Sequence, residues 1–140
     1  MHKYYLSGVR FQRELKSKKV IMSAPVVHFE ILGKNGDKLK EFYKKLFNWK
    51  IDSSNPVKYG LVAKEQNGIG GGIATADGGR NPMVTIYIAV DDVTEYLKKA
   101  EKLGGKIIIP ETVVPKMVIF GMFSDPDGNI IGIVKNEPPK

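Results

Sequence analysis

An internal repeat constrains the fold of this chain more than any other feature of its sequence. An alternating apolar stretch is followed by a helical pattern twice, at residues 26–49 and again at residues 83–103. The residues that superpose are Leu39 on Val93, Phe42 on Tyr96, Tyr43 on Leu97, Leu46 on Ala100 and, in the strands, Val27 on Val84, His28 on Thr85 and Phe29 on Ile86. A repeat of this size predicts two copies of one supersecondary unit that share a core.

The first strand of the repeat has one apolar face and one mixed face. Side chains alternate along a strand, so Val27, Phe29 and Ile31 lie on one side, and His28 and Glu30 lie on the other. We expect the apolar face to pack under a helix that begins with Asp37 as its N-cap. The apolar stripe of that helix, which we expect to be core, comprises Leu39, Phe42, Tyr43, Leu46 and Phe47. Because His28 and Glu30 share the opposite face, the pattern predicts a cleft lined by the mixed strand faces.

Shorter strand patterns complete each copy. In the first copy they fall at 49–51, 59–64 and 69–75, and in the second at 106–109, where Pro110 is expected to stop the strand, at 113–123 and at 130–134. Asp92 is the expected N-cap of the second helix, and the glycines at 104–105 are its expected end. The chain is therefore predicted to be an α+β protein of two βαβββ modules. The expected divisions are a basic leader (1–22), a first module (23–76), a linker (77–82), a second module (83–135) and a tail (136–140).

Composition excludes several classes of site. The 140 residues include no cysteine, which rules out disulfides, thiolate metal ligands and thiol nucleophiles and favours a cytoplasmic location. No apolar run has the length of a membrane span, so we expect no membrane partner. Of the net charge of +7, residues 1–22 supply +5, from six Lys or Arg and one Glu. We interpret that leader as peripheral to function and expect no nucleic-acid partner.

Five short motifs in chain order resemble one known family. They are His28-Phe29-Glu30-Ile31, Phe42-Tyr43-x-x-Leu46-Phe47-x-Trp49, Val90-Asp91-Asp92-Val93, Leu103-Gly104-Gly105-Lys106 and Asp125-Pro126-Asp127-Gly128-Asn129. Over about residues 26–135 the chain resembles the glyoxalase, bleomycin-resistance and dioxygenase-like proteins, the vicinal oxygen chelate superfamily. The resemblance implies two curved half-barrels around a cleft and, in many members, a homodimer. In the metal-dependent members, His, Glu or Gln from the first and last strand of each module hold a divalent ion.

The ligand positions that the resemblance implies are mostly not filled by ligands here. His28 is a competent ligand, but Thr85 stands at the matching position of the second module and Gly132 at the last-strand position. Strand 69–75 offers no His, Glu, Asp or Gln. Since such a metal centre needs several donors at once, we expect no metal and no other cofactor. A divalent metal held by His28, Glu30 and a further donor is the alternative.

Other side chains are predicted to line the cleft with His28 and Glu30. Met83, Thr85 and Tyr87 share one face of the second central strand. Met117, Phe120 and Met122 are candidates for the mouth of the cleft, although Pro115 leaves the phase of that strand open. His28 and Glu30 are also the candidate catalytic pair for acid–base chemistry.

Three functions fit these features. The first is a metal-independent protein that binds a small organic molecule, and either sequesters it or transforms it with His28 and Glu30. The second is a metal-dependent lyase, isomerase or dioxygenase. The third is a structural or interaction module whose cleft is filled by its own side chains. Because this scaffold hosts many chemistries, the fold alone does not choose among them.

Overall fold

A computed structural model describes residues 23–79 and 81–136, so the predicted leader and most of the predicted tail lie outside the described residues. The first half contains β1 (Val26–Gly33), α2 (Gly36–Phe47), β2 (Ile51–Asp52), β3 (Gly60–Val62) and β4 (Gly70–Thr75). A short 3₁₀ turn, η1 (Asp77–Gly79), follows. The second half contains β5 (Met83–Ala89), α3 (Val93–Lys102), β6 (Lys106–Val114), β7 (Val118–Ser124) and β8 (Ile130–Asn136).

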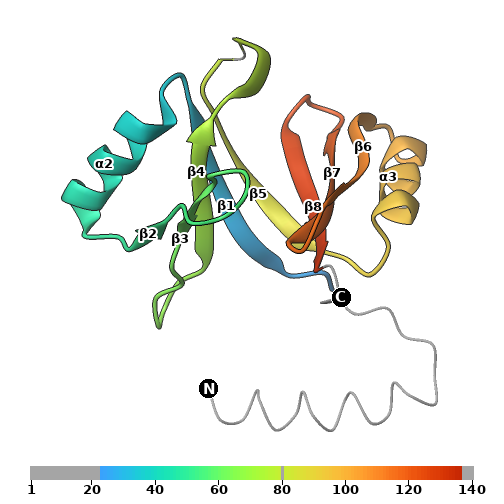
Figure 1. Ribbon diagram of the computed structural model, residues 1–140. Coiled ribbons are helices and arrows are strands. Elements are labelled where there is room, and N and C mark those ends of the chain that lie inside the picture. Colours follow the sequence, from blue (N-terminus) through green and yellow to red (C-terminus); the bar gives the residue numbers. More distant parts are fainter. Residues whose placement is uncertain (1–22, 80, 137–140) are drawn as a thin grey trace, which may run out of the picture.

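The strands form one sheet whose order is symmetric about its centre. The order is β2-β3-β4-β1-β5-β8-β7-β6, with β1 and β5 antiparallel in the middle. Each central strand also pairs in parallel with the last strand of its own half, β1 with β4 and β5 with β8. The sheet is curved and open, and α2 and α3 lie on its outer side (Figure 1). The α+β prediction is confirmed, and we call the face opposite the helices the inner face.

The helix ends follow capping chemistry, with one correction. The N-cap of α2 is Asn35 rather than Asp37, because the Asn35 side chain accepts a hydrogen bond from the Lys38 backbone N–H at 3.1 Å. Asp37 lies in the first turn, where a carboxylate interacts favourably with the helix dipole. The predicted cap of α3 is confirmed, since Asp92 accepts from the Glu95 N–H at 3.0 Å.

The β6–β7 region differs from the sequence prediction. Pro110 does not end the strand, because β6 continues to Val114 through shifts of register on either side of Ile109. β6 is an edge strand, so one of its sides has no neighbouring strand to bond to. Pro110, which has no N–H, is tolerated there because no hydrogen bond is needed on that open side. A turn at residues 115–117 then divides the predicted strand 113–123 into the β6–β7 hairpin. Asn136, assigned above to the tail, belongs to β8.

The two helices are buried to different extents. The stripe of α3 packs into a core with Val93 at 1% and Leu97 at 2% exposure, joined by Val90 and Ile133. On α2 the prediction of a buried stripe is wrong for three residues, because Phe42, Leu46 and Phe47 are 55–57% exposed. α2 packs chiefly against β4, and the outer faces of β1 and β4 carry Gly33 and Gly71. Those strands therefore present too little side-chain surface to cover the whole helix stripe.

Neither helix among the described residues combines the length and the apolar character needed to cross a bilayer.

Candidate functional site

Four side chains meet on the inner face of the two central strands. His28 and Glu30 lie on β1, Tyr87 lies on β5, and Tyr59 directly precedes β3. In the β1–β5 ladder His28 lies opposite Tyr87 and Glu30 lies opposite Thr85. We call His28, Glu30, Tyr59 and Tyr87 the inner-face cluster. The predicted phase of β1 is thereby confirmed, since His28 and Glu30 share the face away from α2.

Hydrogen bonds tie the cluster around the Glu30 carboxylate. Tyr59 Oη donates to Glu30 Oε2 at 2.8 Å, and Tyr87 Oη donates to Glu30 Oε1 at 3.2 Å. His28 Nε2 lies 2.9 Å from Tyr59 Oη. Glu30 is only 8% exposed, so both carboxylate oxygens are held by phenols in a site that is largely shielded from water. Such a network specifies side-chain positions strongly, because each partner left without a bond would carry a desolvation penalty.

The donor and acceptor roles follow from the number of protons. An ionised Glu30 only accepts, so Tyr59 must donate its single hydroxyl proton to it. The Tyr59 oxygen then accepts from an N–H on His28 Nε2, which leaves Nδ1 as the free acceptor of a neutral imidazole. If Glu30 takes up a proton and the His28 ring carries its own proton on Nδ1 instead of Nε2, the same chain reverses, with Glu30 donating to Tyr59 and Tyr59 donating to His28 Nε2. The cluster can therefore hold a proton at either end, as an acid–base relay does.

Burial and charge set the protonation of the cluster. Burial raises the pKa of Glu30, and the hydrogen bonds from Tyr59 and Tyr87 offset part of that rise. Burial also lowers the pKa of His28, which favours the neutral ring. Burial, followed by the negative charge of Glu30, raises the pKa of both tyrosines, so the phenols keep their protons and stay donors.

Two glycines make room for the tyrosine rings. Gly72 in β4 pairs with Glu30, and Gly132 in β8 pairs with Tyr87, so the two glycines occupy equivalent places in the two halves. A Cβ at position 72 would fall inside the ring of Tyr59, and a Cβ at position 132 would fall inside the ring of Tyr87. The rings thus fill the space that last-strand side chains would need on the inner face.

Tyr59 was missed by the sequence reasoning, which placed it only as the start of a strand. The signal that points to it is the run of glycines at 70–72, because a strand without side chains needs large neighbours to cover it. In the structure Asn55 positions Tyr59, accepting from its N–H at 2.9 Å and donating to its carbonyl at 2.7 Å. Tyr59 is therefore anchored through its backbone as well as through its hydroxyl.

The other predicted lining residues fall into two groups. Phe120 and Met122 on β7 join the cluster, with the Phe120 ring edge-on to Tyr87 at 6.5 Å and the Met122 sulfur 4.0 Å from the Tyr87 hydroxyl. Thr85 is buried next to Glu30, but its hydroxyl donates to the Ile130 carbonyl at 2.6 Å. Met83 opens β5, where it pairs with Leu32, and Met117 lies in the β6–β7 turn.

The donor set does not fit the metal centre that the resemblance implies. His28 Nε2 bonds to a phenol, the Thr85 hydroxyl bonds to a carbonyl, and the spaces beside Gly72 and Gly132 hold tyrosine rings. Among residues 23–79 and 81–136, no three His, Cys, Asp or Glu side chains gather closely enough to hold an ion. His28 and Glu30 alone are two donors where such a site uses about four.

Comparison with known families agrees with the fold. The model of the Glyoxalase/Bleomycin resistance protein/Dioxygenase superfamily matches residues 26–133. That match covers most of the chain, and the chain belongs to this superfamily.

Individual relatives are more distant. The chain is 36% identical over 53 residues to "Putative glyoxylase CFP32" of Mycobacterium bovis and of Mycobacterium tuberculosis. The match spans 38% of this chain and only 20% of those proteins.

Among solved structures, methylmalonyl-CoA epimerase from Mycobacterium tuberculosis has a TM-score of 0.61 at 15% identity, covering 85% of this chain and 94% of that one. NAD-dependent benzaldehyde dehydrogenase from Legionella pneumophila has a TM-score of 0.58 at 19% identity, covering 79% and 98%. At these identities the likeness shows the fold alone.

Proposed function

We propose that this protein binds a small organic molecule on the inner face of its sheet, with the inner-face cluster as the polar contact and without a complete metal site. The observation that carries the proposal is the buried Glu30 carboxylate, 8% exposed and held by two neutral phenols. Burying an ionised group costs stability, so most carboxylates lie at the surface. A chain that buries one despite this cost usually does so at a functional site.

The surroundings of the cluster suit a partly apolar ligand. His28, Tyr59 and Phe120 are half-buried, so they form an accessible rim around the more deeply buried Glu30 and Tyr87. The rings of His28 and Tyr59 lie within 23° of parallel, with centroids 6.0 Å apart and their tips joined by the Nε2–Oη hydrogen bond, so together they form a broad aromatic surface on which a flat ligand can lie. Apolar walls with a few convergent polar groups are typical of small-molecule sites.

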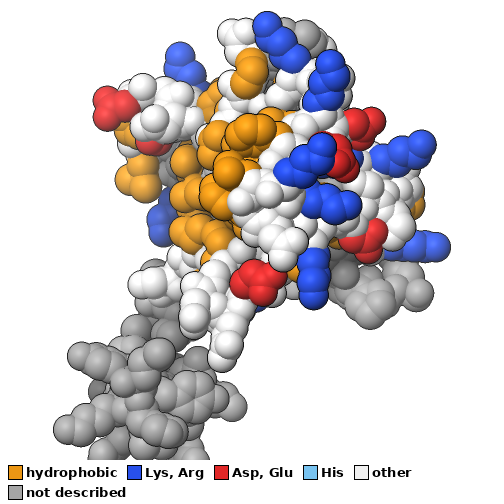
Figure 2. Space-filling view, turned by 90° about the vertical axis from the view of Figure 1, so that its left-hand side faces the viewer, with side chains coloured by type: hydrophobic (Ala, Val, Ile, Leu, Met, Phe, Trp, Pro, Cys, Tyr) orange, Lys and Arg blue, Asp and Glu red, His pale blue; other side chains and the backbone are white. Residues whose placement is uncertain are grey.

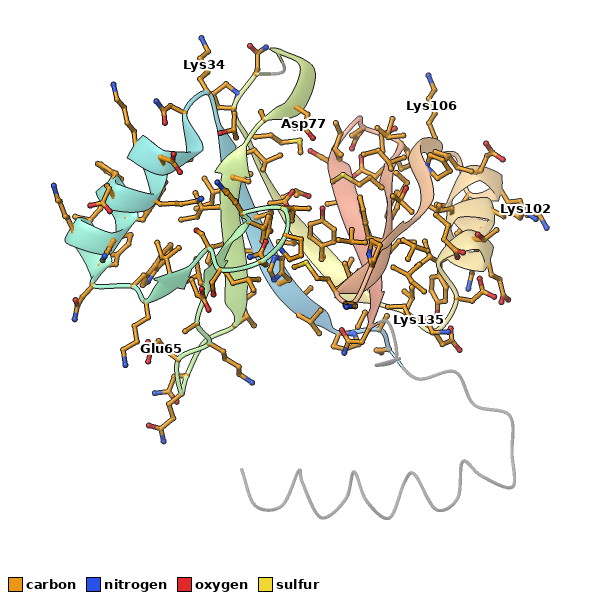
Figure 3. The ribbon with its side chains drawn as sticks, viewed as in Figure 1. Lys34, Glu65, Asp77, Lys102, Lys106 and Lys135 are labelled. Atoms are coloured by element: carbon orange, nitrogen blue, oxygen red, sulfur yellow. The ribbon has the colours of Figure 1, made fainter. Side chains whose placement is uncertain are left out.

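A thermal-shift screen of small organic molecules, run with and without EDTA, tests this proposal. We expect at least one compound to raise the melting temperature of the wild type, with the shift reduced in Glu30→Gln and kept in Glu65→Gln. Glu65 is a suitable control because it lies exposed in the β3–β4 turn, pointing away from the sheet (Figure 3). A shift that EDTA abolishes would favour the metal-dependent alternative. No shift with any compound would favour an interaction module filled by its own side chains.

Acid–base transformation of the bound molecule is a second candidate function. The observation that favours it is the chain from His28 through Tyr59 to Glu30. When Nδ1 of His28 takes a proton from the bound molecule, Nε2 passes its own proton to Tyr59 and Tyr59 passes its hydroxyl proton to Glu30, so the ring stays neutral. For a bound carbonyl compound, we expect NMR in D₂O to show exchange of the hydrogen next to the carbonyl. This exchange is expected to be lost in Tyr59→Phe, which keeps the ring but breaks the chain. Unchanged exchange in Tyr59→Phe would refute the relay.

We also propose that the exposed stripe of α2 is the interface of a homodimer. Phe42, Leu46 and Phe47, the α2 patch, are each more than half exposed, and Figure 2 shows hydrophobic side chains gathered in a band on the side that carries α2. A hollow of about 580 Å³, lined mainly by apolar residues, extends this band from α2 to Val84 at the start of β5, which is 71% exposed. Exposed apolar areas of this kind mark interaction sites.

The charges beside the α2 patch suit a second copy of this chain. Glu41 and Lys45 lie four residues apart and flank Phe42 in one hollow on the helix surface. In a two-fold antiparallel helix pair, Glu41 faces Lys45 of the partner subunit, and the same contact occurs twice. An apolar centre with such a self-complementary charged rim favours an isologous dimer.

Light scattering after size-exclusion chromatography tests the dimer. We expect a dimer for the wild type, a monomer for Leu46→Lys, and a dimer for the control Leu103→Lys, since Leu103 is equally apolar and 72% exposed at the end of α3. A monomeric wild type, or a Leu46→Lys variant that stays dimeric, would rule out this interface.

A further inference from the structure

The inner-face cluster has the chemistry to select its ligand by charge. We infer that the small molecule bound there carries a cationic nitrogen, as a protonated amine or a quaternary ammonium group, which lies against the aromatic rings around Glu30. This inference rests on the proposed function and names the class of ligand for the same site.

The first argument is the charge of the site itself. Both donors to Glu30 are phenols, which stabilise the carboxylate by hydrogen bonds but carry no charge to neutralise it. The ion pair between Lys40 and Asp37 lies on α2 and not on the inner face. Figure 3 shows Lys34, Lys102 and Lys106 pointing outwards, away from the sheet. A ligand cation is therefore attracted to a buried negative charge, and a ligand anion is repelled by it.

The second argument is the aromatic surface around that charge. The His28 ring lies 6.0 Å from Tyr59 and 5.6 Å from Tyr87, and the Phe120 ring lies 6.5 Å from Tyr87. Tyrosine and phenylalanine faces carry negative electrostatic potential and attract cations within about 6 Å of the ring centre. A phenol that donates to a carboxylate gains electron density, because hydrogen bonds in a chain polarise one another. The Tyr59 and Tyr87 faces are thus better cation acceptors than those of free phenols.

The overall charge of the chain acts in the opposite direction but more weakly. The full chain has a net charge of +7, of which residues 23–140, with 16 basic and 14 acidic residues, hold +2. At physiological salt, exposed charges are screened beyond about 8 Å, whereas a buried carboxylate is screened much less. The local negative charge of Glu30 therefore dominates for a ligand that has reached the inner face.

A set of three probes of similar shape separates charge from size. The probes are choline, its neutral isostere 3,3-dimethylbutan-1-ol, and the anion 3,3-dimethylbutanoate. We would titrate each into ¹⁵N-labelled full-length protein and follow the backbone amide signals of the cluster residues. We expect choline to bind about tenfold more tightly than the neutral isostere, as one cation–aromatic contact beside a carboxylate predicts, and the anion to be excluded.

Three variants make the test specific. Glu30→Gln keeps the shape of the side chain and removes its charge, so the preference for choline should disappear. Tyr59→Phe keeps the ring and should retain part of the preference, while Glu65→Gln, which removes an equal charge at the exposed β3–β4 turn, should leave it unchanged. A two-dimensional spectrum of each variant confirms that it is folded.

The outcomes separate the ligand class from the site. Equal binding of choline and the neutral isostere at the cluster would overturn the cation inference and leave the proposed binding site standing. Binding of the anion, a choline preference that persists in Glu30→Gln, or no binding by any of the three probes would overturn the inference as well. The proposed function fails separately, if no compound in the thermal-shift screen stabilises the protein.

Discussion

Substituting Gly72 by alanine should disrupt the inner-face cluster through a single methyl group. A Cβ at position 72 would fall inside the Tyr59 ring, and β4 cannot easily move away because it pairs with β1 on one side and β3 on the other. The Tyr59 ring must therefore leave its place, and its hydrogen bonds to Glu30 and His28 must break.

The expected loss of stability can be worked out from these contacts. Overpacking a well-packed site costs about 1–3 kcal/mol. Losing a hydrogen bond to a charged group costs about 1.5–3 kcal/mol more. We therefore expect Gly72→Ala to lower the free energy of unfolding by about 3 kcal/mol or more. In a Tyr59→Ala background the clash and the bond are already absent, so the same substitution should change stability by less than about 1 kcal/mol.

Urea denaturation of the four members of this double-mutant cycle measures the coupling directly. Gly68→Ala is the matched control, because a Cβ there meets no atom within 4 Å and the change should be nearly neutral. If Gly72→Ala destabilises by less than about 1 kcal/mol, or destabilises equally with and without the Tyr59 ring, the packing described here is wrong.

Three further predictions concern other parts of the fold. Gly132→Ala should clash with the Tyr87 ring as Gly72→Ala does with Tyr59, and in a urea cycle Tyr87→Ala should suppress its effect. Burial raises the pKa of Glu30, so the folded state binds the Glu30 proton more tightly than the unfolded state does. The free energy of unfolding should therefore fall as the pH rises from the ordinary glutamate pKa through the raised value. Glu30→Gln should flatten that part of the stability–pH curve, and an unchanged slope would count against a raised pKa of Glu30. Asp92→Ala removes the cap bond to Glu95 and should cost about 1 kcal/mol in thermal unfolding, which a negligible loss would contradict.

The sequence predicted the fold well because its two periodicities are strong and repeated. Strict alternation along residues 26–32 placed His28 and Glu30 on one face, and the repeat placed Thr85 and Tyr87 beside them, as the β1–β5 register shows. Local signals of this kind act within one strand or one turn. They do not depend on how distant segments pack, which is why they could be read without a structure.

Features that depend on distant packing were missed. Tyr59 joins the cluster because Gly72 leaves the inner face of β4 open, and nothing in its own neighbourhood marks it as a site residue. Helical periodicity marks an apolar stripe but not what covers it, so it predicts Phe42 and Leu46 as core although they are exposed. A proline predicts a strand end unless the strand is an edge strand, and only the sheet order reveals that β6, which contains Pro110, is one.

Mapping a small-molecule hit by NMR tests the central claim most directly. The wild-type protein would be titrated with the strongest compound from the thermal-shift screen, first without and then with EDTA, while all backbone amide signals are followed. We predict that the largest shifts centre on His28, Glu30, Tyr59 and Tyr87, and that Glu30→Gln weakens them. Shifts centred elsewhere, for example on α2, or binding that is lost when EDTA is added, would contradict a metal-free site at the inner-face cluster.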